Sequence, residues 1–234
     1  MTPDDPLFWT ALLKIIGVNI ILSGDNAVVI ALAARSLPEK QQKQAIFWGS
    51  GAAIVMRIVL TLFAVALLAL PWLKLIGSAL LLWIGIQLLT DEGGEDDGIK
   101  SHSSMFAAIK TILIADLVMS LDNVIAVAAA AKNNTLLVMI GLAISIPLII
   151  YASTLLIKLM ERFPIIITIG AALIGWVAGE MAWDEQVIKP FTTQFPHWFE
   201  YIAAAVGAFV VVATGKMLAA RAVQASQGPE GTKA

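Results

Sequence analysis

The fold is decided by the stretch Asn19-Ile-Ile-Leu-Ser-Gly-Asp-Asn-Ala-Val-Val-Ile-Ala-Leu-Ala-Ala-Arg35, which recurs 97 residues later, without a gap, as Asp116-Leu-Val-Met-Ser-Leu-Asp-Asn-Val-Ile-Ala-Val-Ala-Ala-Ala-Ala-Lys132. Both copies are apolar apart from a few polar residues at equivalent positions. The polar residues that recur are Ser23, Asp25 and Asn26 in the first copy and Ser120, Asp122 and Asn123 in the second. A duplication of this kind predicts a chain built from two related halves.

A second duplicated segment extends the repeat. Ile76-Gly-Ser-Ala-Leu-Leu-Leu-Trp83 resembles Ile169-Gly-Ala-Ala-Leu-Ile-Gly-Trp176, so the third helix of each half matches as well as the first. Because each half contains three membrane crossings, the second half enters the membrane from the opposite side. The sequence therefore predicts inverted repeats related by a pseudo-twofold axis in the membrane plane.

The composition indicates a membrane solvent. Apolar residues make up 59% of the 234 residues and charged residues 14%, and the mean hydropathy is +0.86. The apolar residues gather in segments about 20 residues long, the length that crosses a hydrocarbon core of about 30 Å. We expect an all-α membrane protein whose seven transmembrane helices cover approximately residues 8–33, 46–70, 73–90, 106–131, 136–159, 164–183 and 199–220.

The predicted organisation is a single membrane domain over residues 1–234. It divides into a first three-helix repeat (8–90), an acidic cytoplasmic linker (91–105), a second three-helix repeat (106–183), an extra seventh helix (199–220) and a flexible tail (221–234). Ten Lys and Arg residues fall in one set of loops and four in the other. The positive-inside rule then places the N-terminus outside and the C-terminus in the cytoplasm of a multi-pass protein of the cell membrane. The acidic start of the chain does not resemble a cleaved signal peptide.

The duplicated helices predict an ion site. An ionisable side chain within a span costs about 2.5–3.5 kcal/mol on insertion scales, so acids repeated in two spans are expected to have a role. Helical geometry places the polar residues of each copy along neighbouring stripes, and these stripes are expected to face each other near mid-depth. The candidate ligands are Asp25, Asn26 and Asn19 in the first copy and Asp122, Asn123 and Asp116 in the second, with support from Ser23, Ser120 and Gly24.

The side chains of this set offer oxygen ligands, which suit a hard cation such as Mn²⁺, Mg²⁺ or Ca²⁺. Gly24 has no side chain, and beside the acid it is expected to weaken the helix and expose backbone carbonyl oxygens. The chain has no cysteine, which excludes thiolate sites and disulfides. Closely spaced carboxylates cannot all stay ionised cheaply when the site is empty. We therefore expect protons to replace the metal, giving metal/proton exchange.

Several residues have two interpretations. Asp25 and Asp122 could form a structural clasp between helices, and repetition of the acids favours an ion site over it. Asp116 is an ion ligand or an acid paired with Arg57, and Arg57 balances the acids or lies at a cavity. Met119 reaches the ion, where a thioether favours Mn²⁺ over Ca²⁺, or packs in the apolar interior. Glu180 belongs to an exit vestibule or to the membrane interface, where Trp9, Trp72, Trp183 and Trp198 are expected to form an aromatic belt.

The paired Ser-Gly-Asp-Asn and Ser-Leu-Asp-Asn helices resemble the TerC family, in particular its short YjbE-type members, over nearly the whole chain. The resemblance implies a seven-helix fold related to the LysE transporter superfamily. It also implies manganese export, with Asp25 and Asp122 as the central ligands and Mn²⁺ as substrate. The chain departs from a symmetric pattern at one position, because the first copy has Asn19 where the second has Asp116. This difference makes the two half-sites unequal in charge.

Two other function classes stay open. Relatives in the family are linked to metal supply and membrane-protein assembly, so a non-transporting assembly factor that binds secretion or insertion machinery is the main alternative. An intramembrane aspartyl protease fits less well, because such enzymes usually carry Gly-x-Gly-Asp whereas this chain has Leu22-Ser-Gly-Asp25. We expect no enzymatic activity, no organic cofactor and no nucleic-acid partner. The expected partners are the lipid bilayer and the divalent ion, and the sequence leaves a homodimer open.

Overall fold

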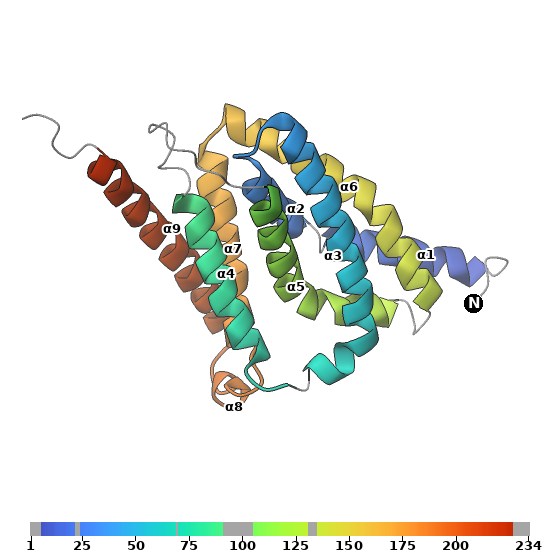
Figure 1. Cartoon of the computed structure of the whole chain (residues 1–234). Coiled ribbons are helices and arrows are strands. Elements are labelled where there is room, and N and C mark those ends of the chain that lie inside the picture. The colour runs from blue at the N-terminus through green and yellow to red at the C-terminus, as the bar shows by residue number, and fades with distance from the viewer. Residues whose placement is uncertain (1–5, 22–23, 69, 91–104, 131–134, 227–234) are drawn as a thin grey trace, which may run out of the picture.

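The computed structural model describes residues 6–21, 24–68, 70–90, 105–130 and 135–226, and in these ranges the chain is helical without β-strands (Figure 1). Within the described helices some side chains, those of Asn19 and Asp122 among them, lie outside the description. The helices are α1 (Pro6–Ile21), α2 (Gly24–Ala34), α3 (Glu39–Leu68), α4 (Leu73–Thr90), α5 (Met105–Ala130), α6 (Thr135–Arg162), α7 (Ile165–Trp183), α8 (Lys189–Thr192) and α9 (Trp198–Ser226).

The helices follow the predicted apolar segments with four differences. The segment 8–33 contains two helices, α1 and α2, on either side of residues 22–23, which are not described. Helix α3 begins at Glu39, ahead of the predicted start at residue 46, because its first two turns are polar and carry no hydropathy signal. The short helix α8 was not predicted. Helix α9 continues to Ser226, beyond the predicted end at residue 220, and residues 91–104 of the predicted linker lie outside the described residues.

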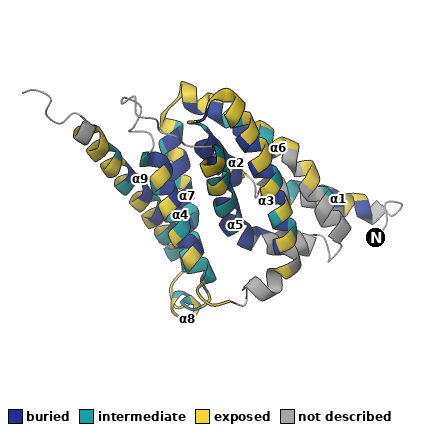
Figure 2. Ribbon diagram, in the orientation of Figure 1, coloured by how far each residue is buried: buried dark blue, intermediate teal, exposed yellow. Residues whose placement is uncertain are grey.

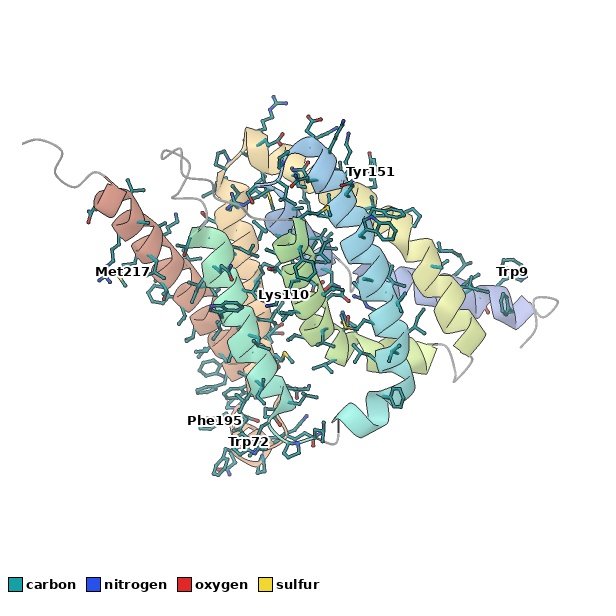
Figure 3. The ribbon with its side chains drawn as sticks, in the orientation of Figure 1. Trp9, Trp72, Lys110, Tyr151, Phe195 and Met217 are labelled. Atoms are coloured by element: carbon teal, nitrogen blue, oxygen red, sulfur yellow. The ribbon has the colours of Figure 1, made fainter. Side chains whose placement is uncertain are left out.

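Three of the described helices, α4, α7 and α9, are long and apolar enough to cross a membrane. Large apolar side chains also face outward from other helices. Figure 3 shows Trp9 on α1, Tyr151 on α6 and Met217 on α9 pointing away from the molecule, and all three are more than half exposed. Exposure of so many apolar side chains is the arrangement expected of helices that face lipid rather than water.

Two groups of helices can be distinguished by how they pack. Helices α4, α7 and α9 lie side by side and make their most extensive contacts with one another (Figure 1). Helices α1, α2, α3, α5 and α6 pack mainly among themselves, and the contacts between the two groups are fewer. We call these the three-helix group and the five-helix group.

Small residues hold the three-helix group together. Gly175 and Gly179 of α7 meet Gly207 and Ala203 of α9 at backbone distance, so that a Cβ at Gly207 would overlap the carbonyl oxygen of Gly175. Spacing of small residues by four along a helix lets two backbones approach this closely within a membrane.

The same group is tied together at the end of the molecule that carries α8. Buried Glu185, which follows α7, accepts N–H bonds from Trp72, Lys74 and Leu75 at the start of α4, at 3.3, 2.9 and 3.2 Å. Trp72 has a positive φ of 70°, a left-handed conformation that is uncommon for a bulky residue, and its bond to Glu185 supports that conformation. Deeper in the group, Ser78 Oγ donates to the carbonyl of Ala178 at 2.7 Å.

The best-buried segments lie where the two groups meet. Figure 2 shows dark blue along α2 and the central turns of α5, while the outer face of α9 is mostly yellow. In α2, the whole run from Val29 to Ala34 is buried. The duplicated stretches thus form the interior of the molecule.

Candidate metal centre

Asp25 lies in the first turn of α2, directly after the exposed Gly24 that begins the helix. Its Oδ1 accepts the backbone N–H of Asn26 at 2.8 Å. An acid at a helix N-terminus satisfies an N–H group that has no partner within the helix and is stabilised by the helix dipole. The start of α2 therefore holds the Asp25 carboxylate in a fixed position inside the molecule, and the Asn26 side chain next to it is 2% exposed.

A cavity of about 290 Å³ reaches this carboxylate. It is bounded by both helix groups, since α2 and α5 form one wall and α7 and α9 the other. The residues that line it are Asp25, Val118, Met119, Asn123, Val177, Glu180, Met181, Asp184 and Glu200. Asp184 and Glu200, which are partly exposed, lie at the end of the molecule that carries α8, so the cavity leads from that end to Asp25.

The cavity brings together one polar residue from each duplicated motif. Asn123 of α5, 8% exposed, lines the same space as Asp25. Met119 lies one turn earlier on α5 and is both a cavity-lining residue and a member of the apolar core. The two interpretations of Met119 are therefore compatible in space, because the side chain packs in the core and borders the cavity.

Glu180 faces the same cavity as Asp25, which is the position that a vestibule acid requires. Its Oε1 accepts the indole N–H of Trp176 at 2.7 Å. Asp184, at the outer end of the cavity, accepts bonds from Lys74 at 2.5 Å and Lys189 at 2.8 Å. Burial acts to raise the pKa of Asp184, but the ammonium groups of Lys189 and Lys74 outweigh it and hold that pKa below its ordinary value of 3.8.

Arg57 of α3 reaches across to α5, where its guanidinium bonds to buried side chains. Its Nη2 donates to Oδ1 of Asp116 at 2.5 Å and its Nε donates to Oγ of Ser120 at 2.9 Å. The Ser120 hydroxyl donates in turn to Oδ2 of Asp116 at 3.2 Å. Of the two interpretations of Asp116, pairing with Arg57 is present in the structure, and a role as ion ligand stays a prediction.

Beyond the cavity, α7 packs tightly against α2. A Cβ at Gly170 of α7 would lie 2.8 Å from Cγ1 of Val28 and 3.1 Å from Cδ1 of Leu32, so α7 rests directly on α2. At the end of this helix, Nη2 of Arg35 donates to the carbonyl oxygen of Leu88 at 2.9 Å, near the end of α4. Among the described residues, the cavity at Asp25 extends toward the α8 end, and α7 packs on α2 between Asp25 and Arg35.

Some predicted site residues fall outside the described residues. Ser23 is not described, and neither are the side chains of Asn19 and Asp122, so the predicted meeting of Asp25 with Asp122 stays a prediction. Among the side chains that the structure describes, no three carboxylate, His or Cys groups converge closely enough to hold a metal ion. A site completed by Asp122 would include a side chain beyond that set.

Sequence reasoning missed three functional positions. Glu200 and Asp184 line the cavity, and Glu185 is buried at 1% exposure, but none of the three was among the predicted site residues. The position equivalent to Glu180 in the first half is Gln87, so the second half carries an additional acid there. This difference between the halves was a signal for the vestibule. No local pattern marks Glu185, because its partners come from a loop more than 100 residues earlier.

Comparisons with known proteins identify similar membrane proteins. The uncharacterized membrane protein YjbE of Bacillus subtilis is 44% identical over 207 residues, covering 88% of this chain and 94% of the relative. The uncharacterized membrane protein YceF of the same organism is 27% identical over 219 residues, covering 89% of this chain and 83% of the relative. The UPF0053 inner membrane protein YgdQ of Escherichia coli is 25% identical over 216 residues, covering 85% of this chain and 89% of the relative.

No solved structure matches the chain. The family model described as the integral membrane protein TerC family matches residues 4–225. The chain therefore belongs to the TerC family of integral membrane proteins.

Proposed function

We propose that the protein is a divalent-cation transporter that exports manganese from the cytoplasm by alternating access. One observation supports this proposal above the others. A cavity lined by Asp25 and Asn123, one from each duplicated motif, leads to the α8 end of the molecule, and α7 packs on α2 at Val28 and Leu32, toward the other end. A polar site inside the molecule that a cavity connects to one end is the arrangement expected of one state of an alternating-access transporter.

The packing of the helices supports two inverted three-helix repeats within seven spans. In this proposal α1 and α2 together form the first span and α5 is its counterpart, while α3 corresponds to α6 and α4 to α7. Under this exchange of halves, the packing of α3 on α5 corresponds to the packing of α6 on α1 and α2. Likewise, the packing of α4 on α5 corresponds to the packing of α7 on α2. Both members of each pair are present, as a pseudo-twofold relation predicts.

The distribution of Lys and Arg assigns the two ends. The Arg35 end belongs to the lysine- and arginine-rich side that the positive-inside rule places in the cytoplasm. The α8 end is then extracytoplasmic and the structure corresponds to an outward-open state. We place the protein in the cell membrane, with the N-terminus outside and the C-terminus inside. Loading from the cytoplasm requires a second state, in which α7 separates from Val28 and Leu32 of α2.

The proposed ligands are the oxygen atoms of Asp25, Asp122, Asn26 and Asn123. Such a set suits a hard divalent ion, and Met119 beside the cavity offers a thioether that favours Mn²⁺ over Ca²⁺ and Mg²⁺. Two carboxylates that share a small site are difficult to keep ionised when it is empty, so we propose that protons take the place of the metal during the return step.

Cellular manganese, measured by mass spectrometry in cells that express the protein, tests this function. We expect wild type to lower cellular manganese and Asp25→Asn and Asp122→Asn to leave it unchanged, with Glu161→Gln, an exposed acid at the end of α6, behaving as wild type. Equal manganese in cells with wild type and Asp25→Asn, at equal protein levels, would contradict transport. It would favour the alternative of a membrane-protein assembly or metalation factor.

A further inference from the structure

The buried contact between Arg57 and Asp116 carries an inference about ion selectivity. Arg57 is 2% exposed and Asp116 5% exposed, so water does not screen either charge directly. Both oxygens of the Asp116 carboxylate are engaged, Oδ1 by the guanidinium and Oδ2 by the Ser120 hydroxyl. A carboxylate bound in this way is neutralised by the protein itself and has little capacity left for an ion.

The pair lies next to the cavity rather than in it. Asp116 and Ser120 occupy the stripe of α5 that faces α3, whereas Met119 and Asn123 of the same turns line the cavity. Asp25 lies within Coulombic range of both Arg57 and Asp116. At the low effective dielectric of a membrane interior, each of these charges changes the potential at the proposed ion site.

Comparison of the two halves indicates why the pair exists. At the position equivalent to Asp116 the first repeat has the neutral Asn19, which leaves the half-sites unequal in charge. The helix equivalent to α3 is α6, and its residues 149–155, which correspond to the region of Arg57, contain no charged residue. Instead Ser153 and Thr154 donate to carbonyl groups of their own helix. The extra acid and the extra base therefore lie in opposite halves, Asp116 in the second and Arg57 in the first, and neither has a charged counterpart at the equivalent position of the other half.

We propose that Arg57 is a selectivity-determining residue that cancels the charge of Asp116, so that the ion site carries the two negative charges of Asp25 and Asp122 and matches a divalent cation. This inference rests on the proposed function. With the pair intact, the two half-sites have equal charge despite the difference between Asn19 and Asp116. Arg57 and Asp116 act through the potential at the site and do not touch the ion.

The proposal predicts affinity changes of opposite sign. Arg57→Gln leaves three negative charges, so Mn²⁺ binding should become tighter by about tenfold or more and La³⁺ should compete better. Asp116→Asn removes one negative charge while the positive charge of Arg57 stays, so Mn²⁺ binding should weaken by about the same factor. Arg57→Gln combined with Asp116→Asn restores the original charge and should return the Mn²⁺ affinity to within about threefold of wild type.

Titration calorimetry of the purified full chain with Mn²⁺, with and without La³⁺, measures these affinities. Arg57→Lys is the charge-preserving control, and Arg221→Gln, at an exposed position near the end of α9, is the matched control for net charge. Arg221→Gln should bind Mn²⁺ as wild type does, and Arg57→Lys should lie closer to wild type than Arg57→Gln does. If a single variant fails to fold, the comparison of the double variant with wild type still decides.

Three other outcomes overturn parts of the account. Weaker Mn²⁺ binding by both single variants would show a purely structural ion pair. A double variant that stays at least tenfold weaker than wild type would show that Asp116 is itself a ligand. Both results reject the inference about Arg57 and do not contradict the proposed transport function. A wild-type protein that binds no Mn²⁺ would reject the proposed function itself.

Discussion

Replacing Glu185 should loosen the three-helix group at the end of the molecule that carries α8. Its carboxylate accepts three N–H bonds from the first residues of α4 and a fourth from Val187 at 3.3 Å. The α4 groups are N–H donors without partners in their own helix, and an acid that accepts them acts as an N-terminal cap supplied by another helix. Glu185 is 1% exposed, so water does not replace it at once.

The magnitude follows from the groups left behind. A buried N–H that loses its acceptor costs about 1–3 kcal/mol, and three such groups, partly rehydrated after relaxation, cost about 3 kcal/mol. For a chain of this length, 1 kcal/mol corresponds to about 2–4 °C in unfolding temperature. Glu185→Ala should therefore lower the unfolding temperature by about 6–12 °C, measured by tryptophan fluorescence of the purified protein in detergent.

The pH dependence gives a second readout. Burial acts to raise the pKa of Glu185, but the N–H donors of Val187, Leu75, Lys74 and Trp72 outweigh it and hold the pKa below its ordinary value of 4.5. A lowered pKa in the folded state means that the stabilisation is present above pH 4.5 and is lost as the pH falls through the folded-state pKa. The stability difference between wild type and Glu185→Gln should be full at pH 7 and shrink below pH 4.5.

The matched control is Glu161→Gln, which removes an exposed acid at the end of α6 and should shift the unfolding temperature by less than about 2 °C. The reasoning would be refuted if Glu185→Ala and this control unfolded at the same temperature. A stability difference between wild type and Glu185→Gln that grows as the pH falls would also contradict it.

Two further predictions concern helix contacts. The side chain of Gly170→Val would meet Val28, so this change should destabilise the packing of α7 on α2 by about 1–3 kcal/mol. Because the chain has no native cysteine, the rate of maleimide labelling at Ala34→Cys reports this loosening and should rise at least about fivefold. Gly51→Val, at a site with open space, should leave the labelling rate unchanged. Gly207→Ala should lower the unfolding temperature by at least about 4 °C, because its Cβ would overlap the facing backbone of α7. Gly51→Ala, where there is open space, should not lower it. Equal unfolding temperatures for the two alanine variants would rule out the close contact of α7 with α9.

The helices were largely predictable from the sequence, because apolar length is a property of the local chain. The segment 73–90 coincides with α4, and 164–183 differs from α7 by one residue at its start. The division of the first segment into α1 and α2 was less accessible. Gly24 beside an acid indicated a weak point in that helix, but nothing in the local sequence shows where each piece packs.

The candidate site was predictable only in its repeated part. Repetition identified Asp25 and Asn123, which the structure places on one cavity. For Asp116 the sequence offered two interpretations, and the partner that distinguishes them, Arg57, comes from a different helix. The other wall of the cavity, with Glu180 and Glu200, depends on how α7 and α9 pack against α2 and α5, which no local pattern encodes.

The central claim is that the two duplicated motifs share one divalent ion, and electron paramagnetic resonance of Mn²⁺ titrated into the purified full chain tests it most directly. Binding immobilises the ion and changes its spectrum, so the number of bound ions per chain can be counted. The account predicts one bound Mn²⁺ per wild-type chain and none in either Asp25→Asn or Asp122→Asn at the same Mn²⁺ concentration. Two ions per wild-type chain, with one retained in each variant, would show independent half-sites and contradict it.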